Sequence, residues 1–176
     1  ANGSLSALGN GVFNVVATAT DAAGNAGADG TNNELTVDTI VPTITVNTLA
    51  TTDTTPALSG TVSETGATIS VVVSGQTRAA TNNGNGTWTL ADNSLTALAN
   101  GVFNVAATAT DAAANAGTDS TTNELTVDNT APVVTVNVLN TNDQRPQLTG
   151  TVNESSAAIR VNVGGQVNLV AVNNGN

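Results

Sequence analysis

Two copies of one short polar motif hold the side chains in this sequence that are best suited to bind a ligand. Residues 20–27 read TDAAGNAG and residues 110–117 read TDAAANAG. Each copy places an Asp carboxylate and an Asn amide four residues apart, and both groups offer oxygen to a hard cation. The sequence has no histidine and no cysteine, so thiol chemistry and zinc–thiolate sites are excluded. The motif therefore predicts a site for calcium, Ca2+.

The composition gives little support to catalysis. A serine nucleophile needs a basic partner, and the sequence contains neither histidine nor lysine. The acidic residues occur in turns and linkers rather than as a pair expected in one pocket. We expect the protein not to be an enzyme.

The net charge of the chain limits which binding partners are expected. The 176 residues include 13 acidic and three basic side chains, which gives a net charge of −10. Nucleic acid and anionic membrane surfaces both require a basic face, so we expect neither as a partner. A divalent cation remains the natural counterpart, although acidity also serves solubility alone.

An internal repeat sets the domain organisation. Residues 4–40 align without gaps on residues 94–130, with 28 of 37 positions identical, and the offset is 90 residues. Residues 41–76 match 131–166 at 19 of 36 positions. The runs VDTIVPTITVN (37–47) and VDNTAPVVTVN (127–137) read as linkers, because proline favours an extended entry into a strand. We predict the C-terminal half of one module at 1–39, a complete module at 40–129 and the N-terminal half of another at 130–176.

Hydrophobic alternation predicts short strands in the complete module. β-Branched residues dominate, and no segment keeps a helical period. The predicted strands are 43–47, 57–62, 68–74, 76–81, 87–90, 101–110 and 123–128. Trp88 alternates with Leu90, so we place it in the core rather than on the surface.

Seven short strands separated by turn signals predict an all-β fold of tandem immunoglobulin-like Greek-key β-sandwich modules, each of about 90 residues. The alternative fold is a right-handed β-helix, which the Thr and Asn content would suit. The repeat of 90 residues argues against it, because coils of such solenoids repeat at shorter intervals.

In such a sandwich the linker and two loops meet at each pole. Calcium takes six to eight oxygen ligands, more than one loop can supply, and carboxylates gathered at one pole repel one another unless a cation lies between them. Each residue has an alternative role, because Asp and Asn also form turns with their own backbone. The predicted ligands are Asp38, Glu64, Asp111, Asn115, Asp128, Glu154, Asp21 and Asp53.

Glu34 and Glu124, which open the last strand of each copy, have two interpretations. They are either further ligands or exposed charges that block pairing at a sheet edge.

The motifs VDTIVPTITVN, TTDTTPALSGTV, GNGTWTL, LANGVFNVAATATDAAANAG and TNNELTVD resemble the bacterial immunoglobulin-like repeats found in the extender regions of giant secreted adhesins of the RTX type. The resemblance covers the whole chain in repeated form. It implies a stalk of sandwiches at the bacterial cell surface or outside the cell, stiffened by calcium at the junctions. The nonapeptide that marks RTX export regions is absent from this sequence.

Two other functions remain open. A glycan- or ice-binding module would need an exposed aromatic residue or a flat polar face. A self-assembling extracellular filament would join the half-modules of different copies, head to tail, by strand complementation. We expect neighbouring repeats of the same protein as partners, and no direct membrane contact.

Overall fold

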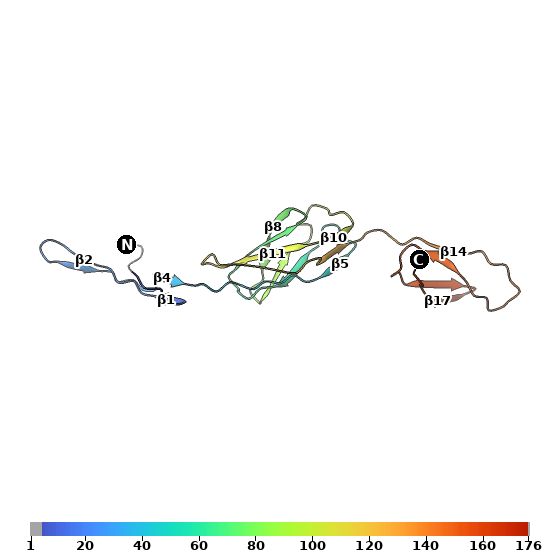
Figure 1. The fold of residues 1–176 in the computed structure, drawn as a ribbon, viewed down its shortest axis with the longest axis horizontal. Helices are drawn as coiled ribbons and strands as arrows, with labels where there is room; N and C mark the ends of the chain where they lie inside the picture. Colours follow the sequence, from blue (N-terminus) through green and yellow to red (C-terminus); the bar gives the residue numbers. More distant parts are fainter. Residues whose placement is uncertain (1–4, 176) are drawn as a thin grey trace. The chain divides into compact units, whose positions relative to one another are not determined.

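The computed structural model describes residues 5–175, and its regular elements within that range are all strands. The chain divides into two compact units, residues 1–129 and 130–176. Figure 1 shows the order of the strands along the chain. Within the described range, no helix is long and apolar enough to cross a membrane. The segment boundaries inferred from the repeat stay predictions.

The complete module forms two sheets, which makes the predicted β-sandwich. The larger sheet has the strand order β12-β11-β7-β8-β9-β6, and the smaller has the order β10-β13-β5. β13 runs antiparallel to β10 and parallel to β5. The strands are β5 (Leu49–Thr51), β6 (Leu58–Thr61), β7 (Thr68–Val73), β8 (Gln76–Asn82), β9 (Thr87–Leu90), β10 (Gly101–Phe103), β11 (Val105–Thr110), β12 (Ala116–Thr118) and β13 (Leu125–Val127).

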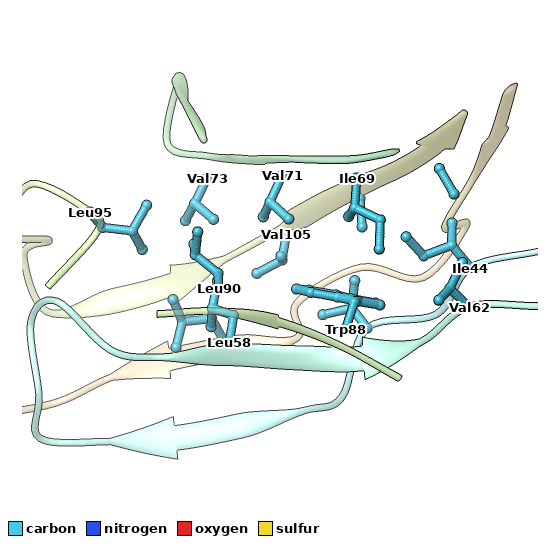
Figure 2. Packing of buried hydrophobic residues seen from close by; sticks show 14 of the residues in the cluster. Ile44, Leu58, Val62, Ile69, Val71, Val73, Trp88, Leu90, Leu95 and Val105 are labelled. Atoms are coloured by element: carbon cyan, nitrogen blue, oxygen red, sulfur yellow. The ribbon is translucent and has the colours of Figure 1, made fainter. Parts of the chain in front are cut away.

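The core lies inside this module, and its members follow the predicted alternation. Figure 2 shows Ile69, Val71 and Val73 of β7 in a row opposite Leu58 of β6 and the β9 side chains. Trp88 is fully buried and Leu90 is 2% exposed, which confirms the core position predicted for the tryptophan. The core is thus built from small aliphatic side chains around one indole.

Three details differ from the predicted strands. The segment predicted as one strand over 101–110 changes partner at Asn104, because β10 pairs with β13 whereas β11 pairs with β7. The predicted strand 43–47 is reduced to one bridge, between Ile44 and Val62. Two strands were not predicted, β5 and β12, and each has only three residues.

A glycine allows the tryptophan to fit. The indole Nε1 of Trp88 donates a hydrogen bond of 2.9 Å to the backbone oxygen of Thr45. Gly60 lies beneath this contact, and a Cβ there would be 1.8 Å from the Thr45 oxygen and 2.6 Å from Nε1. Only a residue without a side chain permits this approach.

The flanking segments repeat parts of this pattern. Residues 5–39 pair β1 (Gly11–Phe13) with β4 (Leu35–Val37), and β2 (Thr18–Thr20) with β3 (Ala26–Ala28). The second unit pairs β14 (Val134–Val136) with β15 (Gly150–Val152), and β16 (Ile159–Val163) with β17 (Gln166–Ala171).

Candidate functional site

The loop between β11 and β12 is organised by Asp111. Its Oδ1 accepts hydrogen bonds from the amides of Ala113 and Asn115, each 2.8 Å long, and its Oδ2 accepts one of 2.8 Å from the side-chain amide of Asn115. The Asn115 side chain, together with the loop amides, lowers the pKa of Asp111 although partial burial opposes this. Asp111 therefore acts first as a turn former that is held in its ionised state.

The first copy of the motif repeats this arrangement. Oδ1 of Asp21 accepts hydrogen bonds from the amides of Ala23 (2.9 Å) and Asn25 (2.8 Å), and Oδ2 accepts one of 2.8 Å from the Asn25 side chain. The pKa of Asp21 is lowered chiefly by the same side-chain amide. The loop conformation is therefore encoded within the motif itself.

The second copy also contacts the linker that enters the module. The side-chain amide of Asn115 donates a hydrogen bond of 3.0 Å to the backbone oxygen of Asp38. Two residues further on, a Cβ at Gly117 would lie 1.8 Å from the backbone oxygen of Pro42. We call these two contacts, Asn115 to Asp38 and Gly117 to Pro42, the linker clamp. The clamp ties the loop after β11 to the entry of the module.

Two other predicted ligands, Asp38 and Glu64, take part in separate hydrogen bonds. Oδ1 of Asp38 accepts a hydrogen bond of 2.9 Å from the amide of Ile40. Glu64 is half-buried, and its backbone oxygen accepts a hydrogen bond of 2.8 Å from the side chain of Asn82. Within residues 5–175, no hydrogen bond joins the Glu64 carboxylate to Asp38 or Asp111.

The remaining predicted ligands each serve a local turn or loop. Oδ1 of Asp53 accepts hydrogen bonds from the amide and the hydroxyl of Thr55, at 2.8 and 3.2 Å. Oδ1 of Asp128 accepts one of 3.2 Å from the side chain of Asn100. Glu154, in the second unit, accepts a hydrogen bond of 2.8 Å at its backbone oxygen from Asn173.

These positions fit a calcium site only in part. The backbone brings Asp38, Asp111 and Asn115 together, but no group of three or more acidic side chains that could hold a metal ion occurs among the residues that the structure describes. Both Asp111 oxygens already accept hydrogen bonds. A cation here would need its remaining oxygens from backbone carbonyls and water.

Sequence reasoning missed the role of Glu124. Its side chain is 2% exposed, so the interpretation as an exposed edge charge is wrong. Oε2 accepts a hydrogen bond of 2.9 Å from the amide of Val105, the first residue after the strand changes sheets, while Oε1 is buried without a hydrogen-bond partner. Burial opposes ionisation, but bonds from Val105 and Thr121 prevail and lower the pKa of Glu124. In both copies an Asn-Val pair is followed 19 residues later by an Asn-Glu pair. This regular spacing was the sequence signal that could have indicated the contact between Glu124 and Val105.

Aromatic side chains do not form a surface platform. Trp88 is fully buried, and Phe13 and Phe103 are half-buried. Stacking against a sugar ring requires an exposed aromatic face, so the described residues give no support to the glycan-binding alternative.

Together the two sheets, their connections and the buried core define an all-β immunoglobulin-like sandwich. Residues 45–129 match the family model described as a bacterial Ig-like domain. Comparison with curated proteins gives no match.

A solved structure of a 1.5-MDa bacterial ice-binding adhesin, described in connection with its retention on the host cell surface, also matches. The identity is 30%, the TM-score is 0.35, and the match covers 64% of this chain and 41% of the other. This chain thus spans less than half the length of that adhesin chain.

Proposed function

We propose that this chain is a stretch of extender repeats from a bacterial adhesin that is secreted or displayed on the cell surface. The bacterial Ig-like match of the complete module, the 90-residue repeat and the resemblance of the flanking segments support this role. In such a protein the repeats bear mechanical load and set the length of the stalk. Their partners are the neighbouring repeats.

The linker clamp is the observation that carries the proposal. A stalk requires each module to hold the chain that enters it, because a freely hinged joint would collapse the spacing. Asn115 and Gly117 contact Asp38 and Pro42 across more than 70 residues of sequence. These contacts use backbone oxygens of the linker, so they do not depend on linker side chains.

Calcium at the junction is a further part of the proposal. The acidic composition and the oxygen-rich meeting of Asp38, Asp111 and Asn115 support it. Calcium that binds only the folded module raises the unfolding midpoint by mass action. The ion would relieve the repulsion between neighbouring carboxylates at the module entry.

Thermal unfolding in calcium chloride and in chelator tests this part. We expect the midpoint followed by Trp88 fluorescence to rise by several degrees in calcium, and the rise to shrink in Asp38→Asn. Asp143→Asn, whose position belongs to the second unit, is the matched control and should keep the full rise. A shift of only a degree or two in the wild type would remove calcium from the proposal.

A second candidate function is a head-to-tail filament. Residues 130–176 expose Val134 and Val136, at 59% and 66%, and residues 5–39 expose Val15 and Val16, at 47% and 75%. The counterparts of these two segments pack together inside the complete module, where Ala109 pairs with Ile69 and Ala107 with Val71. The same register between two copies would place Ala19 opposite Ile159.

Cysteine cross-linking distinguishes this candidate, because the chain has no cysteine of its own. Mild oxidation of the double variant Ala19→Cys, Ile159→Cys should give disulfide-linked ladders if the filament forms. Ala19→Cys, Arg160→Cys is the control, since neighbouring strand residues point to opposite faces. If both variants remain monomers, the filament is rejected and the extender role is the only proposal retained.

A further inference from the structure

The hairpin that joins β8 to β9 in the complete module contains two Asn-Gly pairs, at residues 83–84 and 85–86. A third pair, at residues 100–101, lies where β10 begins. In such a pair the backbone nitrogen of the glycine can attack Cγ of the asparagine, because no side chain on the glycine hinders the approach. The hydrogen bonds around the three pairs differ, so their reactivity should differ as well.

The first pair of the hairpin is held by its neighbours. Nδ2 of Asn83 donates a hydrogen bond of 2.9 Å to the hydroxyl of Thr87, and its Oδ1 accepts one of 3.2 Å from the hydroxyl of Thr89. The N–H of Gly84 donates a hydrogen bond of 3.1 Å to Oδ1 of Asn82. Both the nitrogen that would attack and the amine that would leave are therefore engaged.

The pair at the start of β10 is held as well. Nδ2 of Asn100 donates a hydrogen bond of 3.2 Å to Oδ1 of Asp128, and its Oδ1 accepts one of 3.1 Å from the amide of Asn129. Gly101 pairs with Val127 in the smaller sheet. Turning the Asn100 side chain toward the next nitrogen would break these contacts.

The second pair of the hairpin has the opposite arrangement. The exposed Asn85 accepts two hydrogen bonds at Oδ1, one of 2.6 Å from the hydroxyl of Thr87 and one of 3.2 Å from its amide. Among residues 5–175, no hydrogen bond is donated by Nδ2 of Asn85 or by the N–H of Gly86. The attacking nitrogen and the leaving amine are thus unengaged, while two donors point at the oxygen on which negative charge would develop.

We propose that Asn85 is a self-modifying site, which Gly86 converts to aspartate and isoaspartate using only hydroxide and water. Hydroxide removes the proton of the Gly86 N–H, the nitrogen forms a bond to Cγ, and the Cγ–Nδ2 bond breaks. The amine leaves as ammonia with a proton from water, which restores the hydroxide. One water molecule then opens the succinimide ring at either carbonyl carbon. The two donors of Thr87 stabilise the charge on Oδ1 during the attack.

The two products should differ in their effect on the module. Aspartate keeps the acceptor for both Thr87 donors and adds a charge, which strengthens such hydrogen bonds. Isoaspartate lengthens the backbone by one methylene just before Gly86, whose oxygen accepts a hydrogen bond of 2.9 Å from the amide of Val62. This shift displaces the start of β9, the strand that carries the fully buried Trp88.

The test incubates the full 176-residue chain at mildly alkaline pH and follows its proteolytic peptides by tandem mass spectrometry. Among the three pairs, Asn85 should be the first to show the mass change of an NH2 group replaced by OH. In concentrated urea all three pairs should react at similar rates, because the protecting hydrogen bonds are lost. Asn85→Gln should stop the reaction at this position, since a longer side chain must close a larger, less favourable ring.

A matched pair of variants tests the role of the donors. Thr87→Val removes the hydroxyl donor and should slow the reaction at Asn85 about fivefold, the effect of one ordinary hydrogen bond. Thr89→Val removes a hydroxyl that bonds Asn83 instead, and should leave the rate at Asn85 unchanged.

Thermal unfolding followed by Trp88 fluorescence tests the products. Asn85→Asp should keep the wild-type midpoint, whereas the incubated chain should acquire a fraction that unfolds at a lower temperature. The proposal is overturned if Asn83 or Asn100 reacts before Asn85 in the folded chain, or if Asn85 reacts only in urea. Equal rates at Asn85 in Thr87→Val and Thr89→Val would also overturn it.

Discussion

Residues 95–129 of the complete module and their copy at residues 5–39 contain nearly the same sequence in different surroundings. Their local hydrogen bonds agree: Glu124 accepts from the Val105 amide and Glu34 from the Val15 amide, both at 2.9 Å. Their burial does not agree, because Val105 is 1% exposed and Val15 is 47% exposed. Turn and pairing geometry is thus encoded within about forty residues, whereas burial comes from the opposing layer.

The largest expected effect follows from this difference in burial. Leu125→Ala removes a fully buried side chain and should lower the free energy of unfolding by about 2–5 kcal/mol. Leu35→Ala, the matched change in the copy at residues 5–39, should leave the same transition unchanged. Urea unfolding followed by Trp88 fluorescence reports on the complete module, since Trp88 is the single tryptophan. Equal losses in both variants would mean that residues 5–39 also contribute to that core.

A smaller effect should follow from the linker clamp. Gly117→Ala places a Cβ against the Pro42 oxygen and should destabilise the complete module by about 1–3 kcal/mol. Gly27→Ala meets no atom within 4 Å and should be close to neutral. The same fluorescence measurement compares the two variants. A neutral Gly117→Ala would show that the linker moves away from the loop at no cost.

The smallest effect concerns pH. The folded-state pKa of Asp111 is lowered, so its contribution is complete above the unfolded pKa, near 3.8, and is lost as pH falls through the folded value. Wild type should therefore lose more stability than Asp111→Asn when pH falls from about 7 to about 2.5. Asp21→Asn should follow the wild type when Trp88 is monitored. Parallel curves for wild type and Asp111→Asn would contradict the turn-forming role.

The sequence predicts most of this architecture because alternation records which side chains face inward. The core position of Trp88 was predicted correctly from its alternation with Leu90. The change of sheet at Asn104 leaves no such trace, because alternation continues through it while the hydrogen-bond partner changes. Strands as short as β5 and β12 contain too few residues to show a period.

The candidate site is less predictable for a different reason. Loop chemistry identifies Asp111 and Asn115 as polar partners, but the same spacing serves a turn and a metal ligand equally well. The linker contact of Asn115 uses the backbone oxygen of Asp38, which no residue type reveals. The buried role of Glu124 was not predictable either. A charged residue next to a strand is expected to be exposed unless the backbone amide that it binds is known.

The parallel pairing of β5 with β13 has a mechanical consequence. β5 follows the entry of the complete module and β13 precedes its exit, with Leu125 beside Leu49 and Val127 beside Thr51. Pulling on the two ends loads these strands lengthwise in opposite directions, so their hydrogen bonds resist as a group rather than opening one by one. The bonds from Leu49 to Glu124 (2.7 Å) and from Asp128 to Thr51 (2.9 Å) extend that patch at both ends. A module built this way withstands tension along the direction in which a tether would be stretched.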